Sequence, residues 1–159
     1  MTMKLPENYL EDLISKIHTS QKAVEIISIL DSLSSDSYRT DRKILEPHFR
    51  ALDVACPGIS ALFQDKSAQE IRDLAAELRN ALLAIEKIKV EMSYRPSKDF
   101  ILDLRKIFEL IHKKSDFLLD ISIDPSLENV ARFYYAGKFY SVSLLSYIKD
   151  KMRKASVKI

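Results

Sequence analysis

Two stretches near the C-terminal end decide how the fold is interpreted: Phe117-Leu-Leu-Asp-Ile-Ser-Ile-Asp-Pro-Ser-Leu127 and Tyr134-Tyr-Ala-Gly-Lys-Phe-Tyr-Ser-Val-Ser-Leu-Leu145. The alternation of apolar residues in the first predicts a β-strand over 117–124, with Leu119, Ile121 and Ile123 on one side. The strand should stop at Pro125, because proline cannot donate to a strand ladder. The second stretch predicts a strand, a tight turn at Ala136-Gly137, a short further strand and a final helix. The chain therefore changes character here, since most of what precedes is helical in pattern.

The N-terminal part, residues 1–85, predicts a helical bundle. Apolar residues at helical spacing indicate helices over 6–18, from about Ser20 to Leu33, and over 41–55, where Pro47 should cause a kink or a division into two short helices. The polar segment 34–40 is predicted as a loop. Ser67-Ala-Gln-Glu70 is a capping box, which opens the clearest helix of the chain. Such helices bury their apolar stripes against each other.

The C-terminal part, residues 86–159, predicts a small strand–helix–strand–hairpin–helix domain. The apolar period changes from 3.6 to 2 at Ile88, and Ser97 is a suitable cap for a following helix. A third strand is predicted around Phe133 and a last helix through Leu144, Leu145, Ile148 and Met152. The expected fold class is therefore α+β, mainly α.

Composition excludes several classes of function. The chain has 159 residues, a net charge of +2, two glycines and one cysteine. So few glycines argue against Gly-rich phosphate loops and dinucleotide-binding motifs. A nearly neutral chain with dispersed basic residues argues against nucleic acid as a partner. No run approaches the roughly 20 apolar residues that span a bilayer, so the sequence predicts at most a peripheral membrane role.

The residues that carry chemistry form no catalytic pattern in the sequence. His18, His48 and His112 lie in separate segments without metal-ligand spacing. Asp120 and Asp124 share one face of a predicted strand, but no nucleophile or base joins them, and Asp124 before Pro125 is typical of a turn. The sequence therefore predicts no catalytic residues, no cofactor and no metal site, and indicates a binding protein rather than an enzyme.

An aromatic group is the most distinctive feature that this search leaves. It comprises Phe133, Tyr134, Tyr135, Phe139 and Tyr140. Alternation should expose at least one or two of the tyrosines. Exposed rings beside lysines could stack on single-stranded nucleic acid, or they could anchor a protein interface. A third interpretation is a hairpin whose aromatics simply cover the core.

From Val90 onward the sequence resembles the C-terminal domain of the F-type ATP synthase delta subunit, the oligomycin-sensitivity-conferring protein family. The segment ending in Asp124-Pro125-Ser126-Leu127 matches a family motif, Tyr135-Ala-Gly137-Lys138-Phe139 matches its hairpin, and Ser143-Leu144 matches the start of its last helix. The chain departs from the family at 128–130, where two glycines are usual, and at Ser141, where an acidic residue is usual. The chain is therefore identified as a short, divergent member.

The resemblance implies a stator subunit that joins the catalytic head of the synthase to its peripheral stalk. The helical part would hold N-terminal helices of the alpha subunits, through Tyr9, Leu10 and Leu13, and the motif residues quoted above would contact the C-terminal helices of the b subunits. The implied location is peripheral, on the cytoplasmic face of the bacterial inner membrane, with the membrane reached only through the complex. The alternative is a standalone module that binds protein or single-stranded nucleic acid through the aromatic hairpin.

Overall fold

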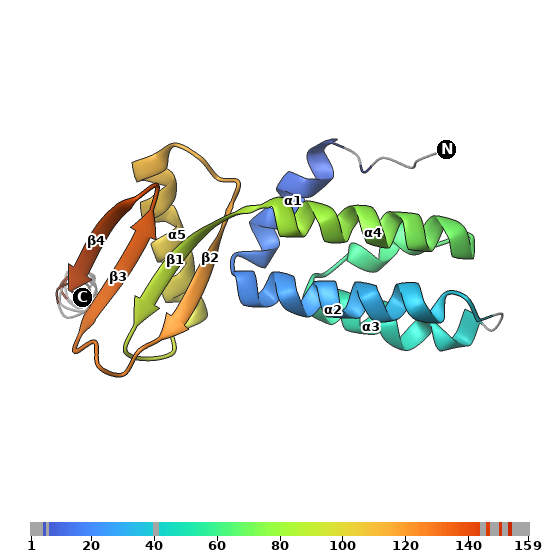
Figure 1. The fold of residues 1–159 in the computed structure, drawn as a ribbon, viewed down its shortest axis with the longest axis horizontal. Helices are drawn as coiled ribbons and strands as arrows, with labels where there is room; N and C mark the ends of the chain where they lie inside the picture. The colour runs from blue at the N-terminus through green and yellow to red at the C-terminus, as the bar shows by residue number, and fades with distance from the viewer. Residues whose placement is uncertain are drawn as a thin grey trace. The chain divides into compact units, whose positions relative to one another are not determined.

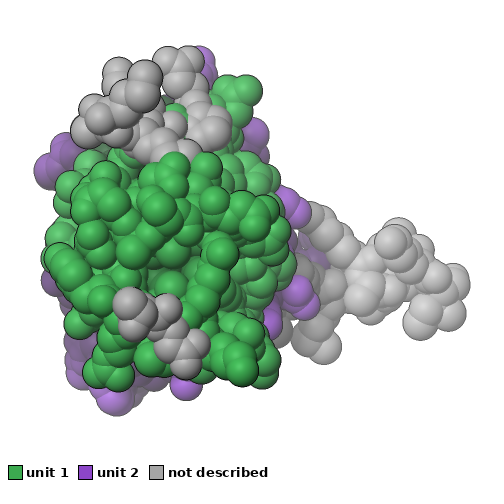
Figure 2. All heavy atoms as spheres, turned by 90° about the vertical axis from the view of Figure 1, so that its right-hand side faces the viewer, with its two compact units in different colours: residues 1–86, 114–118 green, residues 87–113, 119–159 purple. Residues whose placement is uncertain are grey.

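The computed structural model describes residue 5 and residues 7–39, 42–143, 146, 150 and 153. It is mainly helical with a small four-stranded mixed sheet, so the predicted α+β class is confirmed (Figure 1). The chain divides into two compact units, residues 1–86 with 114–118 and residues 87–113 with 119–159 (Figure 2). The sequence placed the boundary after Ile85.

Unit 1 is a bundle built from amphipathic helices. Its elements are α1 (Glu7–Ile17), α2 (Ser20–Asp36), the 3-10 turn η1 (Arg42–Ile44), α3 (Glu46–Ala55), the 3-10 turn η2 (Ile59–Phe63) and α4 (Ala68–Ala84). Each helix turns its apolar stripe inward: Ile26 and Leu30 of α2, Leu52 of α3 and Leu78 of α4 are at most 1% exposed. Burial of these stripes is the main force that holds the bundle together.

Local capping explains where helix α4 begins. The Ser67 hydroxyl accepts from the Glu70 amide at 3.3 Å, and the Glu70 carboxylate accepts from the Ser67 amide at 2.7 Å. These hydrogen bonds lower the pKa of Glu70. The predicted capping box is confirmed. Helix α4 starts there because side chains accept hydrogen bonds from two amides that have no partner within the helix.

The predicted loop over 34–40 is wrong, because α2 continues to Asp36. Two serines bond back to the helix: the Ser32 hydroxyl donates to the Ser28 carbonyl at 3.0 Å, and that of Ser37 to Ser34 at 2.7 Å. Leu33, fully buried, anchors the last turns. Tertiary burial thus overrides a serine-rich composition that favours loops.

Pro47 lies in the first turn of α3, after the separate turn η1. Proline is tolerated there because the first amides of a helix have no partner within it. The predicted division of this segment into two short helical pieces is confirmed.

The sheet has the strand order β2-β1-β3-β4. It comprises β1 (Glu86–Met92), β2 (Phe117–Ile123), β3 (Val130–Tyr135) and β4 (Lys138–Ser143), and α5 (Lys98–His112) connects β1 to β2. The arrows of β1 and β2 run in the same direction, as a helical crossover requires, and α5 lies on one face of the sheet (Figure 1). β3 is antiparallel to both of its neighbours, β1 and β4.

The helix-covered face of the sheet forms the core of unit 2. Val90 lies opposite Phe133 in the register of β1 and β3. The ring of Phe133 meets that of Phe108 of α5 edge to face, with 5.0 Å between their centres. All three side chains are at most 3% exposed. The aromatic pair adds a directional contact to the apolar burial of α5 on the sheet.

Strand β2 does not alternate as predicted. Phe117, Leu118 and Leu119 are all buried, whereas Ile123 is 48% exposed. The reason is tertiary, since Leu118 packs into the core of unit 1, to which 114–118 belong. The predicted final helix, with Leu144, Leu145, Ile148 and Met152, lies outside the described residues.

The β3–β4 hairpin turns at Ala136 and Gly137, as predicted, and both residues have positive φ, 49° and 73°. Two consecutive left-handed residues are the signature of a type I′ turn, where Asn-Gly is preferred and alanine costs about 1 kcal/mol. Ala136→Asn should therefore raise the free energy of unfolding by about 0.5–1 kcal/mol, measured by urea unfolding followed by tyrosine fluorescence. The control, Ala76→Asn on the exposed side of α4, should lower it through weaker helix propensity. A loss of stability in Ala136→Asn would contradict the turn assignment.

Candidate functional site

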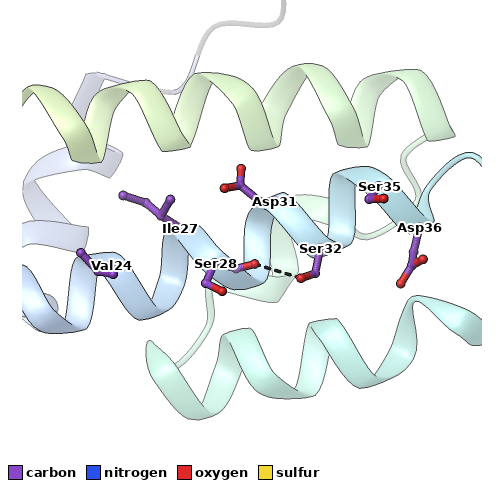
Figure 3. Close-up of a pocket in the computed structure, with 7 residues that line it drawn as sticks. All are labelled: Val24, Ile27, Ser28, Asp31, Ser32, Ser35 and Asp36. Carbon is purple, nitrogen blue, oxygen red and sulfur yellow. Dashed lines mark hydrogen bonds between the residues drawn. The ribbon is translucent and has the colours of Figure 1, made fainter.

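An open groove of about 690 Å³ runs along α2. The residues that line it all belong to α2: Val24, Ile27, Ser28, Asp31, Ser32, Ser35 and Asp36. Figure 3 shows the apolar pair Val24 and Ile27 at one end and Ser32, Ser35 and Asp36 at the other. From Val24 to Asp36 the helix rises about 18 Å, the length of roughly three helical turns.

The carboxylates of the groove are held by neighbouring side chains. Asp31 pairs with Arg79 of α4 at 3.1 Å, and Asp36 contacts the Nε2 atom of His48 on α3 at 2.8 Å. These contacts tie the groove to both flanking helices, and the Arg79 guanidinium offsets the negative charge of Asp31. Its serines are small, so the backbone of a partner could approach α2 closely. The arrangement suits a bound helix.

The sequence did not indicate this groove. Its polar end falls in the stretch predicted as a loop, and serines on a helix carry no periodic apolar signal. The interhelix pairs of Asp31 and Asp36 could not be inferred from spacing, because they join residues on different helices.

The residues predicted to hold the alpha subunit lie on α1, outside the groove. Leu13 is 1% exposed and belongs to the core of the bundle, while Tyr9 and Leu10 are partly buried against that core. Burial, with nearby acidic groups, raises the pKa of the Tyr9 hydroxyl to about 12. Of the three, only Tyr9 and Leu10 have solvent-exposed surface that a partner can contact.

Asp124 is a turn residue, as predicted. Its amide donates to the Met92 carbonyl at 2.8 Å, and its Oδ1 atom accepts from both the amide and the hydroxyl of Ser126 at 3.0 and 2.7 Å. The hydrogen bonds from Ser126 lower the pKa of Asp124. Leu127, at the end of the motif, is only 4% exposed, and Pro125 is exposed. The motif therefore forms the turn that follows β2, at the end of the sheet where β1 also ends.

The hairpin residues lie at the opposite end of the sheet. In the register of β3 and β4, Val130 faces Ser143 and Tyr135 faces Lys138, so Ser143 is near the Asp124 turn and Gly137 is distant from it. The ring of Tyr135 packs against that of His112, with 3.9 Å between ring centres. The motif residues thus form no single surface, and Leu144 lies outside the described residues.

The sheet face opposite α5 exposes an aromatic pair. Tyr134 and Phe139 face each other across β3 and β4, their rings meet edge to face at 5.1 Å, and they are 41% and 54% exposed. The Lys89 ammonium lies 6.0 Å from the centre of the Tyr134 ring and pairs with Glu91 at 3.4 Å. The prediction that the hairpin exposes part of its aromatic group is confirmed.

Neither a metal-binding cluster nor a membrane-spanning helix is seen in the part of the chain that the structure describes. Within that part, His, Cys, Asp and Glu side chains form no cluster of three or more suited to a metal ion. Among the same residues, no helix combines the length and the apolar character needed to cross a bilayer. Cys56 is buried, and this burial raises the pKa of its thiol, which disfavours the reactive thiolate.

Comparison with known proteins finds no protein-family model that matches the chain and no match among curated proteins. The resemblance to the delta subunit therefore rests on the sequence motifs and their order alone.

Proposed function

We propose that the chain is a peripheral-stalk subunit of an F-type ATP synthase, the counterpart of the delta subunit. The observation that carries the proposal is the open groove along α2, which has the length and lining to receive one helix. A stator subunit needs such surfaces and no catalytic residues, because its task is to hold the head of the synthase against the torque of the rotating shaft. Proton flow then drives ATP synthesis instead of turning the head.

The groove supports a helix as its occupant through its lining. Val24 is 61% exposed and provides an apolar contact at one end, and the small side chains Ser28, Ser32 and Ser35 allow close approach along the rest. Amphipathic helices commonly bind in this way, with apolar anchors one turn apart. In the proposal the occupant is an N-terminal helix of an alpha subunit, and the b subunits contact unit 2.

The direct test is isothermal titration of the full chain with two synthetic peptides from the same organism. One carries the N-terminal helix of the alpha subunit and the other the C-terminal helix of the b subunit. Binding of both supports the stator. A folded chain that binds neither peptide would refute it.

Ser28→Trp should weaken binding of the alpha peptide at least tenfold, because an indole at this exposed position would fill the middle of the groove. Thermal unfolding should be nearly unchanged, since surface substitutions usually alter stability by about 0.5 kcal/mol or less. The matched control is Ala76→Trp on the exposed side of α4, which should leave the peptide affinity unchanged. Equal affinities for wild type and Ser28→Trp would exclude the groove as the alpha site.

A second candidate function is binding of single-stranded nucleic acid on the open sheet face. The exposed pair Tyr134 and Phe139, with Lys89 beside it, offers rings for base stacking and a cation for phosphate. Retention of a fluorescent single-stranded oligonucleotide that falls steeply with salt and is lost in Phe139→Ala would favour this function. If the chain does not retain the oligonucleotide at low salt, binding of single-stranded nucleic acid is ruled out.

A further inference from the structure

Helix α5 leaves an apolar patch uncovered. Its inner face packs on the sheet through Leu104 and Phe108, but Ile107, Leu110 and Ile111 are 42%, 81% and 55% exposed. They follow the i, i+3, i+4 spacing that places side chains together on one side of a helix. The apolar face of α5 is thus wider than the area that the sheet buries. These three residues are called the α5 patch below.

Lysines border the α5 patch. Lys106 lies one turn before Leu110, and Lys113 lies three residues after it; both are exposed. Side chains three and four residues apart on a helix are neighbours, although Lys113 already has the left-handed conformation that ends α5. The apolar centre therefore has a basic border.

The carboxylate next to Leu110 on α5 is already paired within the protein. Glu109 bonds to the buried guanidinium of Arg105 at 3.0 Å. Asp103, one turn before Ile107, is half-buried. The charges free to meet a partner are therefore mainly positive, and electrostatic complementarity favours a negatively charged border on that partner.

We propose that the α5 patch binds an amphipathic helix whose apolar stripe is bordered by aspartate and glutamate. Its apolar residues would pack between Ile107, Leu110 and Ile111, and its carboxylates would meet the lysine border. The inference rests on the proposed function, in which this helix is the C-terminal helix of a b subunit. It places the stalk contact on α5 and not on the hairpin around Phe139.

Leu110→Glu in the full chain tests the proposal. Glutamate is a good helix former, and the 81% exposure of Leu110 means that the core is not disturbed, which far-ultraviolet circular dichroism should verify. Titrated with the synthetic b peptide, this variant should bind at least tenfold more weakly than wild type, and the alpha peptide should bind unchanged. Lys106→Glu should also weaken binding of the b peptide and reduce its dependence on salt.

Two matched controls complete the experiment. Val54→Glu changes an equally exposed apolar residue, 80% exposed on α3, and should leave b binding unchanged. Phe139→Ser removes the exposed ring of the hairpin and should have the same neutral result. Loss of b binding in Phe139→Ser but not in Leu110→Glu would overturn the proposal in favour of the hairpin.

The other outcomes separate this proposal from the stator itself. If wild type and Leu110→Glu bind the b peptide equally, the α5 site is refuted and the stator function stands. If wild type binds neither peptide, the stator function fails and the α5 site fails with it. If wild type forms a dimer that Leu110→Glu dissolves, while b affinity stays the same, a second copy occupies the patch and the proposal is overturned.

Discussion

Phe63→Ala is expected to lower the free energy of unfolding by about 3–5 kcal/mol, the usual loss when a fully buried phenylalanine is truncated. Phe63 is 0% exposed at the end of η2, and its ring stacks on that of Phe49 with 6.3 Å between centres. The cavity cannot close easily, because η2 is held in place by Asp53, whose carboxylate accepts from the amide and hydroxyl of Ser60 at 3.1 and 2.6 Å. A loss of this size is a large part of the roughly 5–15 kcal/mol that stabilises a domain.

The measurement is urea unfolding of the full chain, combined with titration of the alpha peptide. Binding of that peptide should be lost together with the bundle, because the groove along α2 exists only in the folded bundle. The control is Phe139→Ala, which truncates the same residue type at 54% exposure and should cost about 1 kcal/mol or less. A loss below about 1 kcal/mol in Phe63→Ala would mean that the bundle core is not packed as described.

Phe133→Ala should have a comparable effect on unit 2, about 3–5 kcal/mol. Its ring is 3% exposed and fills the space between β3 and α5, where it meets Phe108 edge to face at 5.0 Å. Removal of the ring leaves Phe108 of α5 without this edge-to-face contact with the sheet. Binding of the b peptide should be lost because the α5 patch needs α5 in place.

The neighbouring residue supplies the control for this second variant. Tyr134 follows Phe133 on the same strand but points to the open face, where it is 41% exposed, so Tyr134→Ala should cost much less. Both variants are expected to bind the alpha peptide as wild type does if each unit folds by itself. Loss of both peptides in Phe133→Ala would show that the units unfold together. Equal stability of the two variants would contradict the assignment of faces in β3.

Short-range features were predictable because their physical causes lie within a few residues. The Ser67–Glu70 capping box depends on hydrogen bonds between residues three apart, and the hairpin turn depends on the glycine at 137. Apolar stripes at period 3.6 identified the bundle helices in the same way. The serine-rich end of α2 was misread because its local preference is for a loop, and burial of Leu33 outweighs that preference.

The candidate binding surfaces could not be predicted, since they depend on which elements lie side by side. By itself the sequence determined the α+β class, the main helix starts and the exposed rings of the hairpin, all of which follow from local spacing and residue type. Only the tertiary structure decided that the Asp124 turn and Gly137 lie at opposite ends of the sheet, because strand order and register are long-range properties. It also decided which apolar residues remain exposed: Leu13 and Leu110 both lie on apolar faces of helices, yet the bundle buries the first, whereas the second stays exposed on α5.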